Sequence, residues 1–99
     1  MPRYYTPGDG QPGLLLEKHQ QMVQAFNALR NAIRVDPRSE DVDRCFEAFA
    51  HTYSGPTRTF VVAFAPPAQR IRWTSELFAR LSYEIPAEAW NSAPPPMPC

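Results

Sequence analysis

The chain has 99 residues, ten acidic and ten basic side chains, and a formal net charge of zero. This length fits one domain, and the neutral balance excludes the overall positive field that draws proteins to nucleic acids or anionic membranes. Hydrophobic residues make up 43% of the chain, which argues against disorder of the whole. Because no apolar run approaches about 18 residues and no signal-peptide pattern is present, we expect a cytoplasmic protein without membrane contact.

The two ends of the chain differ in composition from its middle. Residues 1–13 contain three prolines and three glycines, which predicts a flexible N-terminal arm. Residues 92–99 (SAPPPMPC) predict a disordered, proline-rich tail. A helical domain is expected between them, over residues 14–91.

The strongest pattern in the chain predicts a long amphipathic helix over residues 14–35. Its apolar side repeats at steps of four and three residues and comprises Leu15, His19, Met22, Phe26, Leu29 and Ile33. A helix of about 22 residues is roughly 33 Å long, which is more than the shorter helices below can cover. We therefore expect the surplus apolar face to form a homodimer through this helix.

Two further helices are predicted. Ser39 is the expected N-cap of the second, which ends before Gly55 and Pro56. Its apolar stripe comprises Val42, Cys45, Phe46, Phe49 and Tyr53. The third spans about 67–84, and Pro86 is expected to begin a short final turn that folds Trp90 back on the core. We expect Leu15, Met22, Phe26, Phe49 and Leu77 in the core or in a dimer seam.

Residues 57–65 (TRTFVVAFA) allow two interpretations. Phe60, Val62 and Phe64 alternate with Thr59, Val61 and Ala63, and these residue types favour an extended segment. The alternative is a short helix with Pro56 at its first position. We expect the extended form, so the predicted fold is mainly α, a three-helix, bundle-like single domain with one short extended segment at about 57–65.

The sequence holds no catalytic signature. Glycine-rich phosphate loops, GxSxG and CxxC motifs are absent, and Cys45 lies on the apolar side of a helix. Two cysteines at the separation of Cys45 and Cys99 indicate neither a disulfide framework nor a metal site. We expect reduced thiols, no enzyme activity and no cofactor.

Residues 17–33 (EKHQQMVQAFNALRNAI) resemble the first helix of hemerythrin-like proteins, where a His followed by Gln opens an iron-binding helix. That family also needs a second helix with a His and a Glu four residues later, and a third with paired His. Here Gly55 stands four residues after His51, and no histidine follows His51. We therefore expect no di-iron site and no other bound metal.

Arginine and aromatic residues concentrate around the third helix. Arg70, Arg72, Trp73 and Arg80 fall on or near one side of it, with Arg58 close in sequence. The simplest interpretation is a solvated helix face with Trp73 in the core. The same residue types suit a protein hot spot or single-stranded nucleic acid.

From these residues we predict a small non-enzymatic protein that binds another protein, with Phe60, Arg70, Arg72 and Trp73 at the partner surface. Adaptors, regulators and inhibitors belong to this class, including those encoded by phages or mobile elements. A nucleic-acid-binding module that uses the Arg/Trp face of the third helix is the alternative.

Overall fold

A computed structural model describes residues 12–96, with side chains from Leu15 onward, and every regular element in that range is helical. The elements are α1 (Pro12–Val35), α2 (Glu40–Thr52), α3 (Arg58–Val62), the 3-10 turn η1 (Pro67–Gln69), α4 (Arg70–Glu84) and α5 (Ala87–Ser92). The predicted mainly α single domain is confirmed, and the described residues are all-helical without the expected extended segment. The expected N-terminal arm lies outside the described residues, except that Pro12 and Gly13 already belong to α1.

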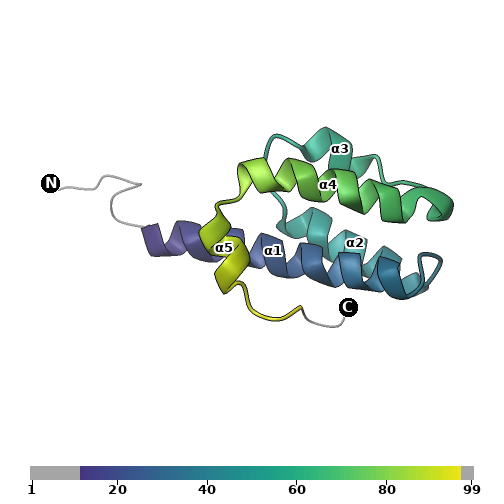
Figure 1. The fold of residues 1–99 in the computed structure, drawn as a ribbon, viewed down its shortest axis with the longest axis horizontal. Helices are drawn as coiled ribbons and strands as arrows, with labels where there is room; N and C mark the ends of the chain where they lie inside the picture. The colour runs from purple at the N-terminus through teal and green to yellow at the C-terminus, as the bar shows by residue number, and fades with distance from the viewer. Residues whose placement is uncertain (1–11, 97–99) are drawn as a thin grey trace, which may run out of the picture.

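The long helix α1 is the scaffold on which α2, α4 and α5 pack (Figure 1). The turn at residues 36–39 returns the chain, and Ser39 then caps α2 by accepting a hydrogen bond from the Asp41 N–H (3.1 Å). Glu40, Asp41 and Asp43 fill the first turn, where the helix dipole favours negative charge. The predicted start of α2 is therefore confirmed.

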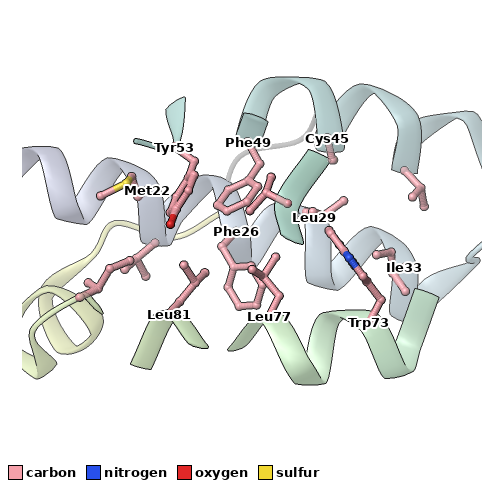
Figure 2. Packing of buried hydrophobic residues seen from close by; sticks show 14 of the residues in the cluster. Met22, Phe26, Leu29, Ile33, Cys45, Phe49, Tyr53, Trp73, Leu77 and Leu81 are labelled. Atoms are coloured by element: carbon pink, nitrogen blue, oxygen red, sulfur yellow. The ribbon is translucent and has the colours of Figure 1, made fainter. Parts of the chain in front are cut away.

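The core lies between α1, α2 and α4. Figure 2 shows Phe26 at its centre, between Phe49 of α2 and Leu77 of α4. The buried hydrophobic residues are Met22, Val23, Phe26, Leu29, Ile33, Val42, Cys45, Phe49, Tyr53, Val61, Ala65, Trp73, Leu77, Leu81, Ile85 and Ala89. The expected core positions are buried apart from Leu15, which is 57% exposed and lies outside the core that the described residues form.

The expected extended segment at 57–65 is wrong, because residues 58–62 form the helix α3. A single strand would leave its backbone groups without partners, whereas a helical turn pairs them locally, as in the Val61 N–H bond to the Thr57 carbonyl (3.0 Å). Adjacent side chains of a strand also point to opposite faces. In α3 both Val61, fully buried, and Phe60, half-buried, pack toward the core.

The C-terminal segment after α5 lies along α1. Gln20 Nε2 donates to Ser92 Oγ (2.7 Å), and Gln24 Nε2 donates to the Pro95 carbonyl (2.9 Å). The expected final turn is confirmed as α5, and Trp90 packs on Phe26 with ring centres 6.0 Å apart. The described part of the predicted tail therefore contacts the amide side chains of Gln20 and Gln24 on α1.

Candidate partner-binding surface

Four aromatic rings from α2, α3, α4 and the loop after α3 form one cluster around Trp73. Phe60 stacks on Trp73 with ring centres 6.0 Å apart, and the edge of Phe64 meets Trp73 at 4.9 Å. Phe46 of α2 stacks on Phe64 at 4.1 Å. These contacts hold α3 against α4, and they hold the loop after α3 against both α2 and α4.

Arg70 is bonded within the fold. Its Nε donates to the Ala65 carbonyl (3.0 Å), and one terminal nitrogen donates to the Pro37 carbonyl (2.7 Å). The other lies 3.7 Å from Asp43 Oδ1, and the guanidinium covers the Phe64 ring at 4.4 Å. Arg70 thus joins the turn after α1, the helix α2 and the loop after α3, and its hydrogen-bonding groups are used inside the molecule.

The other arginines of this face are more open. The side chain of Arg72 is 84% exposed and lies 3.4 Å from Glu76 Oε2. Arg80 covers the Phe60 ring at 4.3 Å. Arg58 donates to the Ala50 carbonyl (2.8 Å) at the end of α2. Arg72 is therefore the arginine of the predicted set that a partner can reach directly.

A groove of about 430 Å³ runs between the loop after α3 and the start of α4. Its lining comprises Ala63, Phe64, Ala65 and Pro66 on the loop, and Gln69, Arg72, Trp73 and Glu76 on η1 and α4. Val62, beside this loop in the chain, is exposed. We call these lining residues the α3–α4 groove.

The four residues predicted to bind a partner lie around this groove in different environments. Trp73 is 6% exposed and belongs to the core, Phe60 is half-buried against it, and Arg70 is bonded internally. Arg72 alone of the four is exposed. Sequence reasoning missed Phe46 and Phe64 as partners of Trp73. Under the helical interpretation, the spacing of Phe60 and Phe64 would have placed both on one side.

A polar cluster, also missed, joins the ends of α2, α3 and α4. Tyr53 Oη donates to Glu84 Oε1 (2.6 Å) and accepts from the Thr57 N–H (2.8 Å), while the Thr57 hydroxyl bonds the other Glu84 oxygen. Burial and the hydrogen bond to Glu84 raise the pKa of Tyr53. These groups satisfy one another, so the cluster is a structural link between the helices.

The residues considered for chemistry lie apart. His51 is exposed and lines a shallow hollow with Glu47, Ala50 and Arg58; His19, half-buried on α1, is not part of it. Within residues 12–96, no group of three or more His, Cys, Asp or Glu side chains could hold a metal ion. Cys45 is buried and disulfide-bonded, so the expected reduced thiol at this position is wrong.

The helices of the described region include none with the length and apolar character of a membrane span. Comparisons with family models, curated proteins and solved structures find no significant match to this chain. Function is therefore inferred from the surface chemistry of the molecule.

Proposed function

We propose that this chain is a small non-enzymatic protein that acts as an adaptor, regulator or inhibitor by binding another protein at the α3–α4 groove. The observation that carries the proposal is the groove itself, in which aromatic side chains anchored in the core adjoin the exposed Arg72. Protein interfaces are enriched in aromatic residues and arginine at their centres. A partner side chain in the groove would meet Phe64 and Trp73 below and Arg72 at the rim.

The predicted residues take different parts in this proposal. Arg72 contacts the partner directly, since its side chain is exposed. Phe60 and Trp73 support the groove from within, and Arg70 fixes its loop wall through the Ala65 carbonyl. Mutation of Phe60, Trp73 or Arg70 is expected to affect partner binding indirectly, by changing the shape of the groove.

A protein partner is favoured over the alternative, a nucleic acid. Single-stranded nucleic acids bind to accessible ring faces and to cations that are free to meet phosphates. Trp73 is almost fully buried, Arg70 is bonded to carbonyl groups, and Arg72 faces a carboxylate at Glu76. The Arg/Trp face therefore offers few of the groups that a phosphate backbone requires.

The test is affinity capture from the native host with the wild-type chain, Arg72→Glu and Ala63→Asp, followed by mass spectrometry and titration of the captured protein. Both substitutions are at exposed positions, so they change the groove and leave the core intact. We expect at least tenfold weaker binding by each. Arg44→Glu is the matched control, because Arg44 is an exposed arginine whose ion pair is with Asp41 on α2.

Salt separates the two classes of partner. A phosphate-binding surface loses affinity by orders of magnitude between about 50 and 200 mM salt, whereas an interface centred on aromatic residues weakens far less. Steep salt dependence, or equal capture by wild-type chain and both groove variants, would contradict the proposal.

Two linked proposals concern the molecule in its cell. Exposure of Leu15 on α1 supports the homodimer expected from the length of that helix. A cytoplasmic location stays a prediction, and the disulfide at Cys45 weighs against it because disulfides persist mainly in oxidising compartments.

A further inference from the structure

A second surface lies where α1, α4 and α5 meet, away from the α3–α4 groove. A hollow of about 290 Å³ is lined by Phe78 and Ser82 of α4 and by Ala87 and Trp90 of α5. Phe78 is 39% exposed, a high value for a large aromatic side chain. The Ser82 hydroxyl donates to the Phe78 carbonyl (2.8 Å), so the one polar side chain of α4 in the lining already has a partner.

The walls of this hollow are fixed by the core. Phe78 meets Trp90 edge-on with ring centres 5.2 Å apart, and Phe78 also stacks on the buried Phe26 at 6.2 Å. Trp90 Nε1 donates to the Ile85 carbonyl (3.2 Å), which leaves its ring to present apolar surface. An apolar side chain could therefore enter a preformed site, with little ordering required on binding.

Arg30 of α1 lies against this site, and Arg34 follows it one helical turn further along α1. The Arg30 guanidinium lies 5.1 Å from the centre of the Phe78 ring. Arg30 and Arg34 each donate to an asparagine three residues earlier, Asn27 (2.9 Å) and Asn31 (3.0 Å). Neither arginine forms an ion pair within residues 12–96, and residues 18–35 contain no Asp or Glu.

This arrangement of cations is unfavourable in the isolated chain. Like charges four residues apart on a helix repel each other. Burial and the neighbouring Arg34 lower the pKa of Arg30, and the Arg30 Nε is buried with no hydrogen-bond partner among the described residues. A carboxylate placed against Arg30 and Arg34 would offset the repulsion between the two guanidinium groups and supply their missing counter-charge. Glu88 of α5 is not among the residues that line the hollow.

We propose that this face binds an acidic segment of another protein, with a large apolar side chain in the hollow and carboxylates against Arg30 and Arg34. A peptide fits better than a nucleic acid because the hollow has apolar walls while the charges lie on one side of it. The proposal is independent of the α3–α4 groove, and variants of the two surfaces separate them.

The test begins with selection of random 12-residue peptides displayed on phage against the whole chain. Binders that also recognise Ser82→Glu are removed, since this substitution places a carboxylate in the hollow. We expect the remaining peptides to carry Asp or Glu around a Leu or Phe. A synthetic peptide of the enriched sequence should bind Arg30→Gln/Arg34→Gln at least tenfold more weakly than it binds wild type.

Controls locate the binding. Two control variants, Arg44→Gln on α2 and Arg72→Glu in the α3–α4 groove, should bind the peptide with wild-type affinity. This expectation holds whether or not a partner binds at the α3–α4 groove. In ¹⁵N NMR spectra the indole signal of Trp90 should shift on titration, while that of Trp73 stays in place. If the double arginine variant fails to fold, Ala87→Glu decides, because Ala87 lines the hollow, is exposed and takes no part in the selection.

Four results would overturn the proposal. The first two are the absence of enriched peptides and the enrichment of peptides without acidic residues. The third is equal binding by wild type and either Ala87→Glu or a folded arginine variant, and the fourth is a Trp73 shift in place of a Trp90 shift. Tighter binding of an oligothymidine of similar length, lost in the arginine variant, would assign the face to nucleic acid instead.

Discussion

The hydroxyl of Tyr53 links the ends of three helices, because it donates to Glu84 of α4 and accepts from the Thr57 N–H at the start of α3. The chain passes this hydroxyl closely at Gly55. A Cβ at residue 55 would lie 2.6 Å from Tyr53 Oη and 2.8 Å from Glu84 Oε1, distances at which a methyl group does not fit. Gly55 therefore does more than end α2, because it leaves room for the hydrogen bond between Tyr53 and Glu84.

This cluster predicts how stability depends on pH. The pKa of Tyr53 is raised above its ordinary value of 10.0, so the folded state holds the proton more tightly than the unfolded state. The resulting stabilisation is complete below about pH 10 and is lost as the pH rises through the folded pKa. Tyr53→Phe should lower the free energy of unfolding by about 1–3 kcal/mol at neutral pH, because Glu84 and the Thr57 N–H lose a partner.

Urea unfolding followed by circular dichroism from neutral pH to above pH 10 measures both effects. The difference in free energy of unfolding between wild type and Tyr53→Phe should become smaller at the alkaline end of this pH range. Tyr83→Phe, which removes an exposed hydroxyl, should follow the wild-type curve throughout. A gap of constant size across this range would show that the Tyr53 proton does not contribute to stability.

At the level of elements, the start of α2 depends on one side chain. Ser39 accepts from the Asp41 N–H, and its own backbone is extended, as an N-cap requires. Ser39→Ala should lower the free energy of unfolding by about 1 kcal/mol. The matched control is Ser75→Ala, since Ser75 is an exposed serine within α4 whose hydroxyl bonds the Ile71 carbonyl. Equal urea midpoints for the two variants would refute the capping role.

The elements also show how far sequence can predict this fold. α1, α2 and α4 were predictable because each is long enough for a helical period to repeat, and Ser39 marks a start. α3 has five residues, too few to distinguish a period of two from one of 3.6. Its helical form is supported by the contact of Phe60 with Trp73 in α4.

The same limit applies to the candidate site. That Trp73 and Arg70 lie near each other follows from their spacing on one helix. Arg70 forms its hydrogen bonds inside the fold, because it donates to the Pro37 carbonyl, 33 residues away, and to the Ala65 carbonyl in the loop after α3. Local sequence carries no signal for such bonds, so arginines that look equally available in the sequence differ in the structure.

At the scale of the whole molecule, α1 extends at its N-terminal end beyond α2 and α4 (Figure 1). Leu15 lies on this end, in line with the buried Met22 and Phe26, yet it is more than half exposed. The apolar stripe thus continues past the core that covers it. Isologous pairing of two such ends would bury Leu15 in both copies, which is the basis of the proposed homodimer.

Substitution at the two ends of α1 tests this pairing. Light scattering across a range of concentrations should give the mass of two chains for wild type and of one chain for Leu15→Glu. Val35→Glu is the matched control, because Val35 is 86% exposed at the opposite end of the same helix, where no apolar stripe is left uncovered, and this variant should stay dimeric. Both substitutions lie outside the core, so the helical content of the variants should equal that of wild type. A single-chain mass for wild type at every concentration would exclude the dimer, and dissociation by Val35→Glu alone would move the interface to the other end of α1.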